Sequence, residues 1–146
     1  SFNEEELIWM NRAHTAKESE SSVKRAQDRG FENITIDFLE KLKQTPEAIT
    51  FTETIAVIEE NYTFTPTTFQ NGLQHNSAGE NSGSCKLFAF AQLQNLSETA
   101  TLACFGAYYF DEVLGDPAGT NHQNIRNFIK TGWNGIQFES EALALK

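Results

Sequence analysis

The sequence predicts a single α+β domain that is mostly helical and carries a small sheet of two or three strands. Apolar residues make up 39% of the 146 residues, and 12 Phe, 3 Tyr and 2 Trp supply large side chains for a core. Apolar residues recur at helical spacing along most of the chain. Two runs at residues 62–70 and 135–139 have an aromatic, β-branched or alternating pattern that indicates strands.

Residues 1–30 are more polar than the rest, and they predict a helical extension that stops at Gly30. One apolar patch interrupts this extension. Its members are Leu7, Ile8, Trp9 and Met10. The patch either folds back on the domain or docks on a protein partner such as a larger assembly; partial disorder of the segment is the third alternative. Residues 31–146 are expected to form the compact domain.

The first two helices of the domain are predicted from their starts and stripes. Thr35 can cap a short helix, and a second helix is expected to start at Thr45-Pro46-Glu47, because proline is favoured at the first helical position. The second helix is expected to end near Asn61. The apolar stripes of the two helices are Phe38, Leu39 and Leu42, and then Ala48, Phe51, Ile55, Ile58 and Tyr62.

The next segment indicates extended chain followed by a loop. Residues 62–65 and 67–70 bracket Pro66 and predict two short strands or a strand and an extended arm. Residues 71–84 contain three glycines and three asparagines and predict a loop.

Three helices and a strand complete the predicted domain. A central apolar helix is expected over residues 85–96, and Ser97 can cap the following one. A short helix capped by Thr120 or Asn121 is expected to stop at Gly132. Trp133 is expected in the core. The strand at 135–139 can join the earlier pair.

The charge of the chain excludes several function classes. Twenty acids against eleven bases give a net charge of −9, which disfavours binding to nucleic acid and to anionic membrane surfaces. No run of about 18 apolar residues is present, so an integral membrane protein is not expected. Basic protein partners or cations stay compatible with this charge.

Two polar loops, at residues 71–86 and 119–127, contain most of the side chains that could form a catalytic or binding site. They contain His75, His122 and six asparagines, and each loop ends where a helix is expected to begin. These side chains either satisfy backbone groups at turns and helix ends or form a binding site. The candidate ligand-binding residues are Asn71, Asn76, Asn81, Ser84, Lys86, Asn124 and Arg126.

Gly83-Ser84-Cys85-Lys86 allows two kinds of site. If Ser84 caps a helix, the helix dipole and Lys86 would lower the pKa of Cys85, and His75 or His122 could then act as its base. Alternatively, the glycine-rich backbone with Lys86 would bind a small anion. The structural alternative is that Cys85 is a small buried residue. No closely spaced metal-ligand pair is present, and we expect no metal and no cofactor.

Two cysteines, Cys85 and Cys104, are too few for a disulfide scaffold and predict buried thiols in a reducing compartment. Such a compartment could be the cytosol, an organelle interior reached after removal of a presequence, or a host cell.

The residues from 51 to 138 resemble the HopJ-type III effector family, and the similarity begins near Phe31. The resemblance is carried by Asn61-Tyr62-Thr63-Phe64-Thr65-Pro66, Ala78-Gly79-Glu80-Asn81-Ser82-Gly83-Ser84-Cys85-Lys86, Leu102-Ala103-Cys104-Phe105-Gly106, His122-Gln123-Asn124-Ile125-Arg126-Asn127-Phe128 and Gly132-Trp133. The family takes its name from a plant-pathogen protein injected into host cells, and the resemblance brings no catalytic residue with it.

These observations favour a protein-interaction or accessory-subunit module. A cysteine-dependent acyl transferase or amidohydrolase and a small-anion-binding domain are the alternatives.

Overall fold

The computed structural model describes the chain from residue 23 to residue 146 and its side chains from residue 34 onward. The predicted docking residues Leu7, Ile8, Trp9 and Met10 lie outside the described residues. No helix of the described part is long and apolar enough to cross a membrane.

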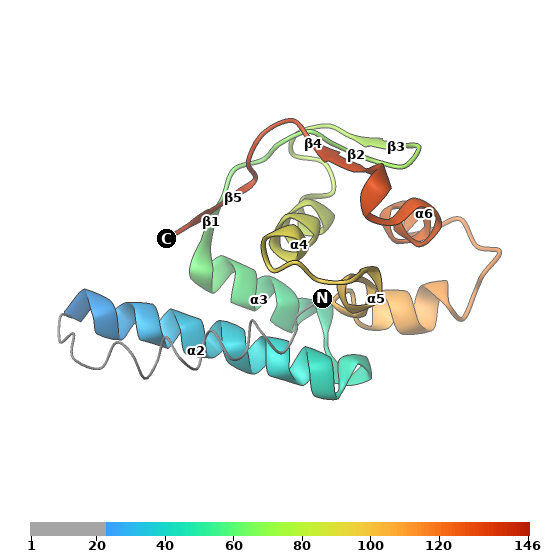
Figure 1. The fold of residues 1–146 in the computed structure, drawn as a ribbon. Coiled ribbons are helices and arrows are strands. Elements are labelled where there is room, and N and C mark those ends of the chain that lie inside the picture. The colour runs from blue at the N-terminus through green and yellow to red at the C-terminus, as the bar shows by residue number, and fades with distance from the viewer. Residues whose placement is uncertain (1–22) are drawn as a thin grey trace.

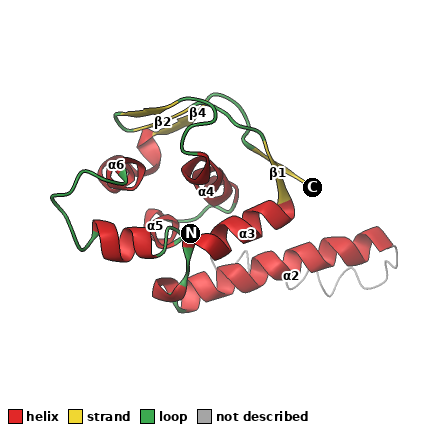
Figure 2. Ribbon diagram, turned by 180° about the vertical axis from the view of Figure 1, so that it is seen from behind, coloured by secondary structure: helices red, strands yellow, loops and turns green. Residues whose placement is uncertain are grey.

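The α+β prediction is confirmed, with helices dominant and two small antiparallel sheets (Figures 1 and 2). The elements run α2 (Val23–Gln44), η1 (Pro46–Ala48), α3 (Phe51–Asn61), β1 (Tyr62–Phe64), β2 (Phe69–Asn71), β3 (Gln74–Asn76), α4 (Ser82–Leu93), α5 (Glu98–Ala103), η2 (Tyr108–Val113), α6 (Gln123–Thr131), η3 (Gly132–Gly135), β4 (Ile136–Phe138) and β5 (Leu143–Leu145).

Helix α2 is longer than the sequence predicts. It continues through Gly30, so the expected helix end there is wrong, and Thr35 lies inside the helix instead of capping a new one. A single internal glycine costs only about 1 kcal/mol relative to alanine, and the buried stripe of Phe38, Leu39 and Leu42 compensates for that cost through contact with the core.

The helix expected from residue 46 to residue 61 is divided into two. Pro46 opens only a short 3-10 turn, and Ile49 and Thr50 are extended. Thr50 then starts α3 with a capping box, in which its hydroxyl accepts from the Glu53 amide and its own amide donates to the Glu53 carboxylate. The stronger cap therefore sets the helix start, five residues after the predicted one.

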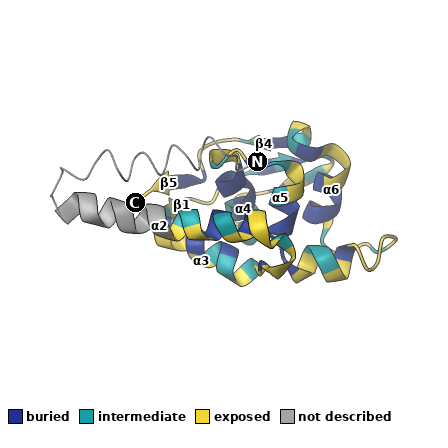
Figure 3. Ribbon diagram, turned by 60° about the horizontal axis from the view of Figure 1, so that its bottom comes forward, coloured by how far each residue is buried: buried dark blue, intermediate teal, exposed yellow. Residues whose placement is uncertain are grey.

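Helix α4 lies at the centre of the molecule, between the three-stranded sheet and α3 (Figure 1). It begins after Asn81, which is its N-cap residue. The prediction that Ser84 caps this helix is therefore wrong. Phe88 is fully buried and its ring meets those of Phe105, Phe128 and Trp133. Trp133 packs against the core and its indole nitrogen donates to the Leu96 carbonyl, which confirms its predicted place. Figure 3 shows buried positions along both α4 and α6.

The sheets differ from the prediction in two strands. β4 pairs with β2, as expected, and Gln137 lies opposite Gln70. The segment after β2 turns at Gly72 and returns as β3, although its composition predicts a loop. β5 pairs with β1 and has no counterpart in the prediction. The two strands predicted around Pro66 therefore belong to different sheets.

Gly106 brings the end of α5 against the start of α3. The predicted helix from Ser97 does begin at Ser97, whose hydroxyl accepts from the Ala100 amide, but it ends at Ala103 and a π-helical segment, η2, follows. Gly106 has a left-handed φ of +63°, and a Cβ there would lie 2.9 Å from both the Ile49 oxygen and the Phe51 nitrogen. Only glycine combines this φ with so close an approach.

Replacing Gly106 is therefore expected to destabilise the fold. In Gly106→Ala the added methyl group meets rigid backbone, and we expect a loss of about 2 kcal/mol or more in the free energy of unfolding, measured by urea denaturation. The matched control is Gly79→Ala, which has φ +92° but no atom within 4 Å of the added carbon. Equal losses in the two variants would show that backbone strain, and not the close approach, explains the glycine.

Candidate functional site

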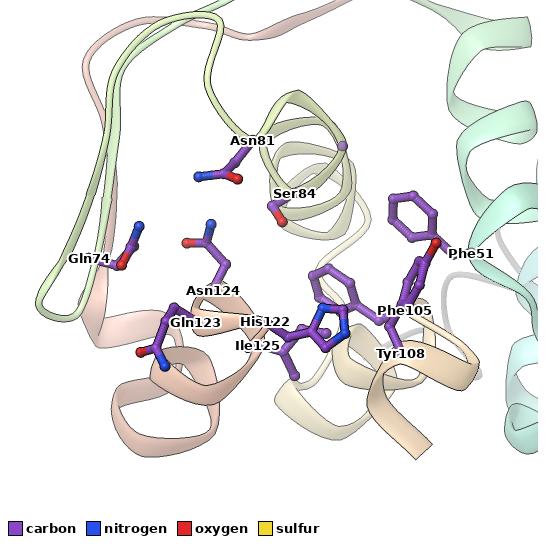
Figure 4. Close-up of a pocket in the computed structure, with 11 residues that line it drawn as sticks. Phe51, Gln74, Asn81, Ser84, Phe105, Tyr108, His122, Gln123, Asn124 and Ile125 are labelled. Atoms are coloured by element: carbon purple, nitrogen blue, oxygen red, sulfur yellow. The ribbon is translucent and has the colours of Figure 1, made fainter. Parts of the chain in front are cut away.

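A pocket of about 440 Å³ lies where β3, the start of α4, the start of α6 and the α5–η2 turn meet (Figure 4). Its lining comprises Phe51, Gln74, Asn81, Gly83, Ser84, Phe105, Tyr108, His122, Gln123, Asn124 and Ile125. Asn81, Ser84, His122 and Asn124 were predicted as site residues from the sequence, and the fold brings these four together although they lie in two separate loops. None of the lining residues is Asp, Glu, Lys or Arg.

The polar wall of the pocket is formed by the starts of two helices. Asn81 precedes α4 and His122 precedes α6, and both have left-handed backbone, with φ of 52° and 54°. Neither side chain caps its own helix, because the Asn81 amide donates to Asn76 and the His122 Nε2 is paired with Glu112 at 2.6 Å. The first backbone N–H groups of a helix have no partner within it and carry the positive end of the helix dipole. This wall therefore suits hydrogen-bond acceptors and negative charge.

The opposite wall of the pocket is aromatic. Phe51 and Phe105 stack with ring centroids 6.1 Å apart, and Tyr108 meets Phe51 edge-on at 5.4 Å. The Tyr108 ring also lies 5.2 Å from the His122 ring and is 40% exposed. In Figure 4 these three rings lie across the pocket from the amide side chains. Gly83 fits closely against this wall, since a Cβ there would lie 2.8 Å from the Phe51 ring.

A cluster of buried amides supports the polar wall. Asn76 and Asn124 exchange two hydrogen bonds, of 2.9 and 3.2 Å, and Asn71 donates to both the side-chain and the backbone oxygen of Asn124. Asn81 joins the cluster by donating to Asn76 at 2.7 Å. These bonds tie the β2–β3 hairpin to the starts of α4 and α6. Asn71 and Asn76, predicted as ligand-binding residues, therefore lie beneath the pocket instead of lining it.

The two predicted cationic ligands lie elsewhere. Arg126 is only 8% exposed, and its guanidinium donates to the carbonyls of Asn121 and Asp116 and to the Asn121 side chain. These bonds hold the loop before α6. Lys86 is paired with Glu59 at 2.9 Å and lies over the Phe64 ring. Neither residue lines the pocket.

The proposed nucleophile and bases are not joined in this structure. The Cys85 thiol is 1% exposed and donates to the Thr67 carbonyl. Burial raises the pKa of Cys85, which is opposite to the expected lowering, and the weaker effects of the Thr67 hydrogen bond and of Lys86 do not reverse it. His75 is exposed and pairs with Gln70, and His122 pairs with Glu112. Cys85 and Cys104 are both buried and free, as expected.

Sequence reasoning missed the aromatic wall. Phe51 is assigned by its spacing to an apolar helix stripe, and Phe105, Gln74 and Gln123 are not among the predicted site residues. Tyr108 falls within the segment that becomes the π-helix η2, so its direction does not follow from a regular 3.6-residue period. The described part of the chain contains no group of three or more His, Cys, Asp or Glu that could hold a metal ion.

Comparison with known proteins agrees with this fold. The family model described as "HopJ type III effector protein" matches residues 35–143, so the chain belongs to the HopJ type III effector family. It is similar to the crystal structure of VPA0580, a protein of unknown function, with 56% sequence identity and a TM-score of 0.74. That match covers 75% of this chain and 92% of the other. No curated protein matches this chain.

Both thiols are expected to react slowly in the folded protein. Burial raises the pKa of Cys104 from 9.0 to about 12 and also raises that of Cys85, so the thiolate fraction at neutral pH is small. The Cys104→Ala variant isolates Cys85, and we expect its iodoacetamide reaction rate to show no titration step below pH 9.0, the ordinary value. The denatured variant is the control. A step clearly below that pH would restore Cys85 as a nucleophile.

Proposed function

We propose that this domain is a binding module that holds a small ligand in the pocket between α4 and α6. The ligand has an acceptor-rich or anionic group and an apolar body. The observation that carries the proposal is the pairing of the two walls: helix starts and amides on one side and aromatic rings on the other. Most ligand pockets combine an apolar lining with a few polar groups that fix orientation, and they occupy about 300–1,000 Å³.

The charge around the pocket supports an anionic group. The chain has a net charge of −9, yet no carboxylate lines this pocket. Two helices, of 12 and 9 residues, begin at its rim. An anion there would be stabilised by both dipoles without meeting a carboxylate in the lining.

Binding is favoured over catalysis by the placement of the nucleophiles. In the part of the chain that the structure describes, no hydrogen bond joins the Cys85 thiol or the Ser84 hydroxyl to an imidazole. A nucleophile and its base need such a contact, of roughly 2.6–3.2 Å.

Ser84 offers a sharp test of this binding role. Its hydroxyl lines the pocket and makes no hydrogen bond to another described residue, so Ser84→Ala leaves the internal bonds unchanged. Acetate, benzoate and phosphate can be compared as ligands by NMR titration. We expect the one that binds most tightly to shift the amide signals of residues 82–84 and 123–125. Ser84→Ala is expected to weaken that binding about 3- to 10-fold, as for one lost hydrogen bond.

The control for this titration is Ser77→Ala, which removes an exposed hydroxyl outside the pocket. Similar weakening in both variants, or chemical-shift changes spread over the surface without saturation, would contradict the pocket as the binding site.

We infer that a protein-interaction role resides in the N-terminal segment. The family match begins at residue 35, so the apolar patch at Leu7, Ile8, Trp9 and Met10 lies outside the shared domain. Membership in a type III effector family supports interaction with host proteins and delivery to the reducing interior of a host cell.

The patch can be tested without removing any described element. Deleting residues 1–22 is expected to leave the free energy of unfolding unchanged and to abolish cross-linking to the partners of the intact chain. The Trp9→Ala substitution is expected to reduce that cross-linking strongly, because large aromatic side chains dominate interfaces. Ser19→Ala, in the same segment, is the control. An unchanged set of cross-linked partners after the deletion would rule against the docking role.

A further inference from the structure

A second pocket of about 400 Å³ adjoins the aromatic wall. It is formed by η1, the start of α3 and the α5–η2 turn. Phe51, Phe105 and Tyr108 line this pocket as well as the first one, and Phe110 adds a fourth ring. We call it the acidic cleft, because Glu47 and Asp111 are also in its lining and both residues are exposed.

The electrostatics of the acidic cleft are opposite to those of the first pocket. No Lys, Arg or His lines the cleft, and no ion pair joins Glu47 or Asp111 to a residue of the described part. The start of α3 is already capped by Thr50 and Glu53, so its amides are less available to an anion than those of α4 and α6. The cleft therefore combines two unpaired carboxylates with aromatic faces.

This combination suits an organic cation. Cations are attracted to aromatic faces within about 6 Å, and a guanidinium also forms directed hydrogen bonds to carboxylates. The chain already contains one such arrangement: Lys86 lies 4.9 Å from the centre of the Phe64 ring and 2.9 Å from a Glu59 oxygen. Arginine stacks on rings better than lysine because its charged group is planar and weakly hydrated.

We propose that the acidic cleft is a docking site for an arginine side chain of a basic partner protein. The guanidinium lies over the exposed Tyr108 ring and between Glu47 and Asp111, which come from elements far apart in the sequence. The net charge of −9 on the chain provides long-range attraction to such a partner. The acidic cleft and the small-ligand pocket share Phe51, Phe105 and Tyr108 and differ in all their other lining residues, so carboxylates line the cleft alone.

The test uses the full chain and a capped peptide, acetyl-Gly-Arg-Arg-Gly-amide. We expect saturable NMR shifts confined to residues 46–52 and 105–111, and a dissociation constant that rises with salt. The same peptide with citrulline in place of arginine keeps the shape but loses the charge, and it is expected to bind at least about 5-fold more weakly. Equal affinity for the two peptides, or no saturation with the arginine peptide up to about 1 mM, would overturn the proposal.

Variants separate the cleft from general charge attraction. The double variant Glu47→Gln/Asp111→Asn is expected to weaken peptide binding about 5- to 10-fold. The matched control Glu60→Gln/Glu139→Gln changes the net charge equally at exposed positions outside the cleft and is expected to change affinity less than about 2-fold. Equal weakening of peptide binding in both double variants would show that the peptide is held by non-specific charge attraction and would contradict the proposed site.

The aromatic contribution has its own readout. Tyr108→Leu is expected to weaken binding of the arginine peptide. Tyr108→Phe is expected to keep the affinity for this peptide, because the face of the ring remains. If Tyr108→Leu binds as well as the unsubstituted chain, the ring does not contact the cation and the proposed geometry is wrong. Failure here leaves the anion titration at residues 82–84 unaffected, so the two proposals are judged separately.

Discussion

The architecture of the candidate site depends on one buried interaction, the paired hydrogen bonds between the side-chain amides of Asn76 and Asn124. Asn76 lies on β3 and Asn124 in the first turn of α6, so this pair joins elements that are distant in sequence. A buried amide that loses its partner costs about 1–3 kcal/mol, which is why one arrangement is strongly favoured over others. Through Asn81 the same cluster reaches the start of α4. Both helix starts are thereby held at one rim, and the side chains that could have capped them are used elsewhere.

Most of the helices could be predicted from the sequence because their signals are local. The Ser97 cap, the Gly132 stop and the apolar run of α4 each depend on residues a few positions apart. The errors occur where a distant contact decides the structure. α2 continues through Gly30 because its later turns are buried. β3 forms in a polar segment because its backbone pairs with β2 and its Asn76 side chain bonds to Asn124. A prediction from neighbouring residues in the sequence cannot identify these distant contacts.

The candidate site was predictable in part for the same reason. Asn81, Ser84, His122 and Asn124 could be identified because polar residues gather in two loops that each lead into an expected helix start. Their function could not be separated from scaffolding, since that depends on which atoms are already paired. Cys85 shows the limit clearly: its position near a helix start indicates a lowered pKa, but its burial raises the pKa, and the hydrogen bond to the Thr67 carbonyl does not reverse that effect. Desolvation of the Cys85 thiol outweighs both the Thr67 hydrogen bond and the charge of Lys86, which lower its pKa.

The aromatic residues explain how one small domain can present two unlike surfaces. Phe51, Phe105 and Tyr108 form a partition whose one side meets helix starts and amides and whose other side meets Glu47 and Asp111. An aromatic ring has a negative face and a positive edge, so the same wall can contact an apolar or a cationic group. Gly83 and Gly106 allow this wall to stand close to α4 and to α3, because a side chain at either position would collide with Phe51 or its backbone. The two glycines, which have no side chain, therefore set the spacing on which the shape of both pockets depends.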